Sequence, residues 1–290
     1  MSGFNADWLA LREPADRHAR DPQLAHDFIG ALSAPGGAPR RLIDLGGGTG
    51  ANLRILAPLI DGDQQWLLID WDTHLLEHAC KALGDWAQAL GHRVSFQASY
   101  VDIQSPRGRW QIRTRRLDLA QSLESIELKN FDAVVTTAFL DLVSAPWLDR
   151  LAAWLAQTPR PLLATLTVDG RRQWYPTHLN DEFIQRAFRT HQAGDKGFGE
   201  SLGPAAIDDL CARLSARGFQ VRTAPSDWQL DGHSRQLLQT LLSDEAAVAL
   251  EVHPEAQIAI REWLSVRSAQ LELSELSLRV GHQDLLALPG

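Results

Sequence analysis

The chain has 290 residues, 44% of them hydrophobic, which is enough for one substantial buried core. Its 28 basic and 36 acidic residues give a formal net charge of −8, which disfavours nucleic acid as a partner because phosphates need a basic surface. Charged residues crowd the N-terminus and no later apolar run is long enough to span a bilayer, so we expect no signal peptide, no membrane contact and a cytoplasmic location.

Strand and helix patterns alternate along the first part of the chain. A helical lead-in over 21–32 precedes a short apolar run at 41–45, which ends in a glycine-rich loop followed by helical spacing over 51–60. A second buried strand at 65–70 and a long amphipathic helix over 73–90 repeat this order. Because successive parallel strands need helical crossovers, the alternation predicts a parallel sheet.

The middle of the chain continues the sheet. Alternating residues over 94–118 predict a hairpin-like insertion that leads into the third strand. The fourth strand is expected at 131–136, its helix at 147–157 and the fifth strand at 161–168. Each of these segments has the apolar run or the helical spacing that a buried α/β core requires.

The last part of the chain breaks and then resumes the pattern. Segment 171–203 is rich in aromatic, His and Gly residues and is expected to be an insertion that faces the substrate. A helix over 205–217 and a strand over 219–230 follow, then two helical patterns and a last strand at 276–288. We therefore expect a mostly parallel seven-stranded sheet in one domain over 40–290, with insertions at 171–203 and 233–272 and an N-terminal helical cap over 1–39.

The glycine-rich loop between the first strand and its helix has the features of a ligand-binding turn. In Asp44-Leu45-Gly46-Gly47-Gly48-Thr49-Gly50, the missing side chains permit positive φ and let a ligand rest on the main chain. A helix that begins near Ala51 would favour a ligand carboxylate. Asp70, at the end of the second strand, is placed to accept hydrogen bonds from a ribose diol, and Trp71 offers an aromatic face to an adenine.

This loop resembles the first motif of the class I S-adenosylmethionine-dependent methyltransferases, an acid followed by three alternating glycines, DxGxGxG. The resemblance covers 40–168 well and 219–288 only by strand pattern, as the crossed pair of terminal strands typical of that family. It implies a Rossmann-like, doubly wound α/β fold, S-adenosyl-L-methionine as the cofactor, and an acid at the end of the third strand that contacts the adenine amino group. We expect the cofactor to contact Asp44, Gly46, Gly47, Gly48, Gly50, Asn52, Asp70, Trp71, Asp118, Leu119 and Thr136, with Arg12 of the N-terminal helix closing over its carboxylate.

Two rival functions fit the same features. Gly46, Gly48 and Ala51 also satisfy the dinucleotide fingerprint GxGxxA, so an NAD(P)-dependent oxidoreductase is one rival. A non-catalytic, S-adenosylmethionine-binding regulatory protein, in which 171–203 docks a partner, is the other. Asp70 is also open to a second interpretation, as the cap of the helix that follows it.

The expected chemistry is methyl transfer to an oxygen or nitrogen atom of a small-molecule metabolite. A sulfonium is already a good leaving group, so the protein mainly positions the acceptor and removes its proton where needed. The fourth strand is not followed by the acid-or-Asn and double-proline motif of base methylation, and neither cysteine follows a proline, which favours a small molecule. The catalytic candidates are His178, His191 and Asp141, and the substrate-binding candidates are Trp174, Tyr175 and Lys196.

One metal-like spacing occurs in the helix after the second strand. His74-Leu75-Leu76-Glu77-His78 formally matches the zinc pattern HxxEH, which places two imidazoles on one helix face. Because the cofactor fold already explains a helix at this position, we expect no metal. The oligomeric state is not readable from the sequence.

Overall fold

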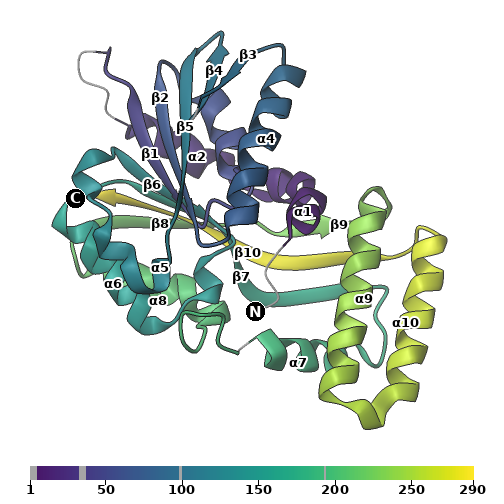
Figure 1. Cartoon of the computed structure of the whole chain (residues 1–290). Helices are drawn as coiled ribbons and strands as arrows, with labels where there is room; N and C mark the ends of the chain where they lie inside the picture. Colours follow the sequence, from purple (N-terminus) through teal and green to yellow (C-terminus); the bar gives the residue numbers. More distant parts are fainter. Residues whose placement is uncertain (1–4, 33–36, 98–99, 193) are drawn as a thin grey trace.

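The computed structural model describes residues 5–32, 37–97, 100–192 and 194–290. Residues 33–36 of the predicted break after the first helical lead-in, and Ala193 of the predicted insertion, lie outside them. The described strands form one sheet in the order β3-β4-β5-β2-β1-β6-β7-β10-β8, with β9 paired to β10 (Figure 1).

Five strands form the parallel part of this sheet. They are β1 Arg40–Leu45, β2 Gln64–Asp70, β5 Gly108–Arg116, β6 Ala133–Thr137 and β7 Leu162–Tyr175. The chain builds outward from β1 through β2 to β5, and then returns to the other side of β1 with β6. Such a reversal leaves a crevice beyond the carboxyl ends of the two central strands, and open α/β sheets bind ligands there.

The end of the sheet has the crossed arrangement that the resemblance implied. β10 Ser277–Pro289 lies antiparallel between β7 and β8 Phe219–Pro225. This order confirms the predicted Rossmann-like, mostly parallel sheet. The predicted count of seven strands is wrong, since the sheet has ten within the described residues.

The three additional strands have local causes. Residues predicted as one hairpin-like insertion form β3 Arg93–Phe96 and β4 Val101–Ser105, which extend the sheet antiparallel beyond β5. The strand predicted over 219–230 is divided, and its second piece is β9 Trp228–Leu230. Both pieces pair with β10 in the same register, and between them the Ser226 N–H donates to the His282 carbonyl, 2.9 Å away.

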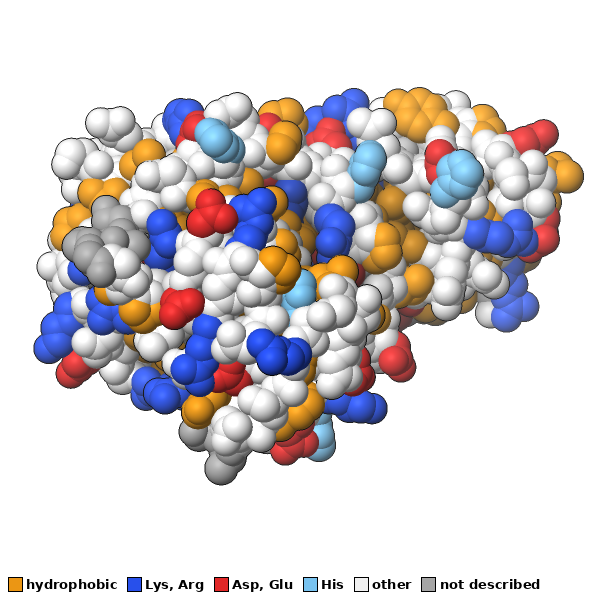
Figure 2. All heavy atoms as spheres, turned by 90° about the horizontal axis from the view of Figure 1, so that it is seen from above, with side chains coloured by type: hydrophobic (Ala, Val, Ile, Leu, Met, Phe, Trp, Pro, Cys, Tyr) orange, Lys and Arg blue, Asp and Glu red, His pale blue; other side chains and the backbone are white. Residues whose placement is uncertain are grey.

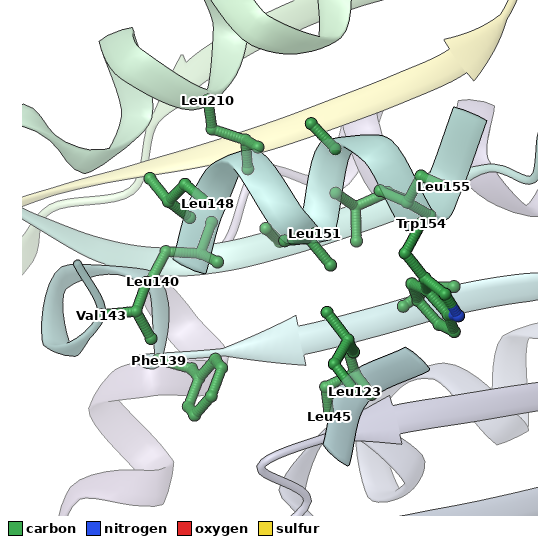
Figure 3. Packing of buried hydrophobic residues seen from close by; sticks show 14 of the residues in the cluster. Leu45, Leu123, Phe139, Leu140, Val143, Leu148, Leu151, Trp154, Leu155 and Leu210 are labelled. Carbon is green, nitrogen blue, oxygen red and sulfur yellow. The ribbon is translucent and has the colours of Figure 1, made fainter. Parts of the chain in front are cut away.

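Helices cover both faces of the sheet. Neighbouring residues of β1 show the division, because Leu42 and Ile43 are both fully buried but belong to different hydrophobic clusters. The face to which Leu42 points is covered by α2 Pro22–Gly30, α3 Ala51–Leu56 and α4 Thr73–Ala89. The face to which Ile43 points is covered by α5 Leu119–Ser122, α6 Ala145–Gln157 and α8 Ala206–Ser215. Figure 3 shows the cluster on the Ile43 face, where Leu148, Leu151 and Leu155 lie between the sheet and Leu210.

A helical lobe is built on the part of β7 and β10 that runs past the central sheet (Figure 1, right). It contains α7 Asp181–Gln192, α9 Arg235–Val252 and α10 Gln257–Glu272, and apolar residues of α1 Ala6–Ala19 pack against its core. β7 continues past the predicted insertion boundary at Arg171, because β10 pairs with it as far as Tyr175. The predicted insertions therefore join one ribbon of the sheet.

The surface carries no strong separation of charge on the face seen in Figure 2. Basic and acidic side chains are interspersed there, and the helical lobe forms the narrower projection at the right. Among the described helices, none combines the length and apolar composition that crossing a bilayer requires.

Candidate functional site

The glycine loop forms a tight left-handed turn at the crevice. Gly46, Gly48 and Gly50 have φ values of 68°, 49° and 81°, which side-chain-bearing residues rarely adopt. The Gly47 N–H donates to the Ile69 carbonyl of β2 at 2.8 Å. The loop is thereby held across the ends of β1 and β2, with its main chain at the edge of the crevice.

Two side chains press against this loop. A Cβ added at Gly46 would lie 2.9 Å from Cδ2 of Phe139, and one added at Gly48 would lie 3.3 Å from Cδ1 of Leu9. Phe139 lies just past the tip of β6 (Figure 3), whereas Leu9 belongs to α1. The loop is therefore enclosed between the end of β6 and the N-terminal helix.

A buried polar group lies at the start of the loop. Asp44 is fully buried, and its Oδ1 accepts a hydrogen bond of 2.9 Å from the Asn52 side chain. Arg20, between α1 and α2, donates to Asn52 Oδ1 at 2.7 Å and to the Thr137 hydroxyl at 3.0 Å. Asp44 Oδ2 and Arg20 Nε are both buried and have no hydrogen-bond partner among the described residues. Each has capacity left for a ligand.

The environment of Asp44 makes it a weak acid. Burial raises the pKa of its carboxyl to about 7, although the Asn52 hydrogen bond and the charge of Arg20 oppose the increase. A carboxyl whose pKa is raised by folding stabilises the native state below its ordinary pKa, and this contribution is lost as the pH rises through about 7.

We therefore expect Asp44→Asn to be more stable relative to the unmodified protein at about pH 8 than at about pH 5, because the amide never ionises. Urea unfolding of both proteins across this range measures the difference. The exposed Asp7→Asn provides the control, which should show no such trend. A difference in unfolding free energy that does not change with pH, or that changes in the opposite direction, would contradict the raised pKa of Asp44.

Asp70 lies at the end of β2, beside the loop. Its Oδ2 accepts the Gly48 N–H at 3.0 Å, and its Oδ1 accepts the Asp72 N–H at 3.0 Å. The cap of α4 is Asp72, whose carboxylate accepts the His74 N–H at 2.8 Å. Burial raises the pKa of Asp70, and these backbone donors oppose the shift. The capping role considered for Asp70 thus belongs to Asp72. Trp71, which lies between them in the sequence, is half-exposed.

The ends of the third and fourth strands hold the remaining predicted cofactor contacts. Asp118 is exposed, and its Oδ1 accepts the Ala120 N–H at 2.9 Å as the cap of α5. Leu119 is buried, and its carbonyl accepts the Trp147 indole N–H at 2.8 Å. Thr136 donates its hydroxyl to the Leu45 carbonyl at 2.7 Å, so that the hydroxyl nearer the crevice is that of Thr137.

The N-terminal helix is tied to the loop by an ion pair. Glu13 accepts from Arg54 Nε at 2.8 Å, and Arg54 also donates to the Thr49 carbonyl at 2.7 Å. Arg12 instead pairs with Asp16 and lies 4.9 Å above the Trp228 ring. Of the N-terminal arginines 12 and 20, it is thus Arg20 that donates to residues beside the loop.

A second buried carboxyl lies beyond β6. Asp141 belongs to the 3-10 helix Leu140–Leu142, and its Oδ1 is buried without a hydrogen-bond partner among the described residues. Burial raises its pKa to about 6, while a backbone donor at Val168 and the charge of Arg12 oppose the shift. This carboxyl can hold a proton near neutral pH.

Part of the predicted insertion packs next to Phe139. The Phe198 ring lies 5.4 Å from the Phe139 ring and 5.5 Å from that of Trp147, both edge to face. Asp195 accepts the N–H groups of Gly197 and Gly199 at 2.7 and 2.9 Å, which shapes the turn around Phe198. Lys196 is half-buried in this turn, and its Nζ lies 3.5 Å from the His191 carbonyl.

Four other candidates lie in or next to the helical lobe. Trp174 is buried in its core and donates to Glu245 at 3.0 Å, so its ring has no free face for a substrate and we leave it out of the site. His178 accepts the Asn180 N–H at Nδ1, 3.1 Å away, in the turn before α7. Tyr175 is exposed at the end of β7, and His191 is exposed near the end of α7.

The zinc-like pattern does not gain further ligands. His74 and His78 lie on α4, and within the described residues no group of three or more His, Cys, Asp or Glu side chains is arranged to hold a metal ion.

The sequence analysis did not identify Thr137, Phe139 and Phe198 as residues near the glycine loop, because no local pattern marks them.

Comparison with known proteins gives only distant likenesses. No family model matches the chain, and a search of curated proteins found no match. A methyltransferase of Geobacter sulfurreducens, solved with S-adenosyl-L-homocysteine, has 15% identity, coverage of 100% of both chains and a TM-score of 0.47. A cyclopropane synthase of Mycobacterium tuberculosis has 12% identity, coverage of 98% of this chain and 94% of its own, and a TM-score of 0.47.

A third likeness involves a longer protein. Phosphoethanolamine N-methyltransferase 2 of Haemonchus contortus, solved with S-adenosyl-L-methionine, has 12% identity and a TM-score of 0.47. The match covers 100% of this chain but only 58% of that protein. With scores this low, the fold assignment depends on the strand order of the chain itself.

Proposed function

We propose that the chain is an S-adenosyl-L-methionine-dependent methyltransferase that binds its cofactor in the crevice beyond β1 and β6. The observation that carries the proposal is the pair of unpartnered buried atoms there, Arg20 Nε and Asp44 Oδ2. The amino acid end of S-adenosylmethionine has a carboxylate, which matches Arg20, and an ammonium group, which matches Asp44. A dinucleotide pyrophosphate has no cationic group to offer Asp44 and would place further negative charge beside it.

Further residues suit the rest of the cofactor. Asp70 is a carboxylate beside the loop, of the type that accepts hydrogen bonds from a ribose diol. Trp71 is 49% exposed and offers a ring face, and Asp118 has one oxygen not used in capping α5. We propose that these three residues hold the adenosine portion, at the ends of β2 and β5.

The cofactor supplies an electrophilic methyl group on a sulfonium. The chain binds and orients it with the glycine loop, Arg20 and Asp44, and α1 limits the access of water through Leu9. Asp141 is the proposed proton acceptor for the substrate, because its pKa of about 6 lets it take up a proton near neutral pH. His178 and His191 become secondary candidates, since they lie in or next to the helical lobe.

We propose an oxygen or nitrogen acceptor on a small molecule, with nucleic acid excluded by the acidic net charge. In this arrangement 1–39 serves as a cap over a catalytic domain at 40–290, and 171–203 and 233–272 contribute the substrate side. Free cysteines at 80 and 211 are consistent with a reducing, cytoplasmic location.

Titration calorimetry tests the cofactor. The protein is expected to bind S-adenosylhomocysteine and not NAD, whereas binding of NAD alone would overturn the proposal in favour of an oxidoreductase. Incubation with methyl-labelled S-adenosylmethionine and the small molecules of a cell extract tests catalysis. Binding without any labelled product would favour the regulatory alternative.

A glycine exchange tests the loop itself. Gly48→Ala is expected to weaken S-adenosylhomocysteine binding at least about tenfold, because the new Cβ strains a backbone with φ of 49° and displaces Leu9. Gly91→Ala is the matched control, since Gly91 has φ of 79° but no atom within 4 Å of the added Cβ. Equal calorimetric affinities for the two variants would place the ligand away from the loop.

A further inference from the structure

A buried histidine of β10 lies next to an irregularity in the β7–β10 pairing. Val280 pairs with Arg172 and His282 pairs with Val168, so three residues of β7, 169–171, lie opposite the single residue Gly281 and the bulge belongs to β7. A Cβ at Gly281 would lie 2.2 Å from Oδ1 of Asp169, so only glycine fits opposite this bulge.

The surroundings of His282 select one form of its imidazole. The residue is 2% exposed, and its ring lies 5.1 Å from that of Trp228. Nδ1 lies 3.1 Å from the Val280 carbonyl, which can only accept a hydrogen bond, so Nδ1 carries the proton and Nε2 keeps a lone pair. Within the described residues, no hydrogen bond involves Nε2.

Charged groups around His282 preserve this neutral form. Burial, together with the charges of Arg12 from α1 and Arg172 from β7, lowers the pKa of the imidazole to about 3. Asp227, between β8 and β9, acts in the opposite direction and accepts the His282 backbone N–H at 3.2 Å. The ring therefore remains a hydrogen-bond acceptor throughout the physiological pH range.

His282 and Asp141 converge on the same point of the fold. Val168 is the β7 partner of His282, and its backbone also faces the Asp141 carboxyl. The charge of Arg12 acts on both groups. Two proton acceptors from different elements are thus both linked to Val168, in the part of β7 that follows its pairing with β6.

We propose that His282 positions the methyl acceptor by accepting a hydrogen bond at Nε2, so that the acceptor is an amine or a hydroxyl compound. This inference rests on the proposed methyl transfer. The acceptor lone pair forms the new bond to the methyl carbon, and the carbon–sulfur bond breaks with its electrons passing to sulfur. The N–H or O–H proton then leaves its hydrogen bond with Nε2 and passes to Asp141. His282 keeps its own proton at Nδ1.

The acceptor class can be tested without knowing the acceptor. The small molecules of a cell extract are divided, and one portion is treated with acetic anhydride, which caps amines and hydroxyls. A portion treated with N-ethylmaleimide, which caps thiols, is the control. We expect labelled methyl product from the untreated and maleimide-treated portions only. Product that survives acetylation would overturn the inference, since the acceptor would then be a carboxylate or a carbon atom, and so would loss of product with maleimide.

Variants test the residue. His282→Leu fills a similar space without an acceptor atom and is expected to lower kcat/KM for the extract pool at least about tenfold, mainly through KM. His282→Gln restores an acceptor near the Nε2 position and should recover part of the loss. The matched control is His233→Gln, an exposed exchange outside the cluster. Activity of His282→Leu equal to that of the unmodified protein would overturn the positioning role.

Nuclear magnetic resonance of the ¹⁵N-histidine-labelled protein supplies a readout that does not need turnover. The His282 signals, identified by their loss in His282→Gln, are expected to report a neutral Nδ1–H ring from about pH 7 to about pH 5. An Nε2–H ring or a charged ring overturns the proposal. Failure to bind S-adenosylhomocysteine would instead reject the proposed function, so calorimetry separates the two failures.

Discussion

Arg20→Ala is expected to abolish measurable binding of S-adenosylhomocysteine and to destabilise the fold. The guanidinium is the donor that joins Asn52 and Thr137 at the crevice, and the carboxylates of Asp16, Asp284 and Asp44 all stabilise its charge. Removing it leaves buried acids without their cation, which costs roughly 3 kcal/mol of folding free energy. Loss of the contact with the ligand carboxylate is expected to weaken S-adenosylhomocysteine binding at least about a hundredfold.

Calorimetry and urea unfolding measure these two effects separately. Arg20→Lys keeps the charge but not the planar group that reaches two partners, so it should retain much of the stability and less of the affinity. Arg17→Ala, at the end of α1 and three residues before Arg20, is the matched control, because the Arg17 side chain is 51% exposed. Binding by Arg20→Ala as strong as that of the Arg17 variant would exclude Arg20 from the site.

The central sheet was predictable because its strands are buried on both faces. Runs such as those of β1 and β2 are nearly continuous in apolar residues, and the glycine loop between β1 and α3 marks the crevice. Asp44 and Asp70 follow from the same local pattern. The sequence therefore indicates which strands meet at the site, since the ends of parallel strands share one edge of the sheet.

The cation at this edge was not predictable in the same way. Arg12, Arg17 and Arg20 all lie near helical spacings, and nothing local distinguishes them. The choice is made by distant partners, because Arg12 lies over Trp228 while Asn52 and Thr137 accept from Arg20. These contacts join segments far apart in the chain.

The helical lobe and His282 illustrate a second limit. β7 was expected to end before Arg171 because the segment that follows is rich in aromatic, His and Gly residues, yet β10 pairs with it as far as Tyr175 and extends the ribbon. Trp174 was predicted to bind substrate but packs in the lobe core. The bulge of β7 opposite Gly281 is likewise visible only as a register shift between two strands, so no local pattern distinguishes His282.

Asp141→Asn is expected to lower kcat about a hundredfold or more if the carboxyl receives the acceptor proton. In the unmodified protein, kcat/KM should rise with pH through about 6 and then level off, because only the ionised carboxylate can take a proton. Besides burial, the groups that act on Asp141 are its own backbone, the charge of Arg12 on α1 and the backbone of Val168 on β7. Asp44 also titrates close to this range, with a pKa of about 7, so the assignment to Asp141 depends on the profile of the Asn variant.

The Asn variant should lose this pH dependence and remain folded. Since folding raises the pKa of Asp141, its ionisation opposes folding as the pH rises through about 6, and the uncharged amide should be no less stable at about pH 8. Labelled methyl transfer to the extract pool gives the rate at each pH, and thermal melting checks the fold. A variant that keeps the rise through pH 6 would assign the titrating group elsewhere. A variant that keeps the full rate would mean that the acceptor loses its proton to solvent, with His282 alone orienting it.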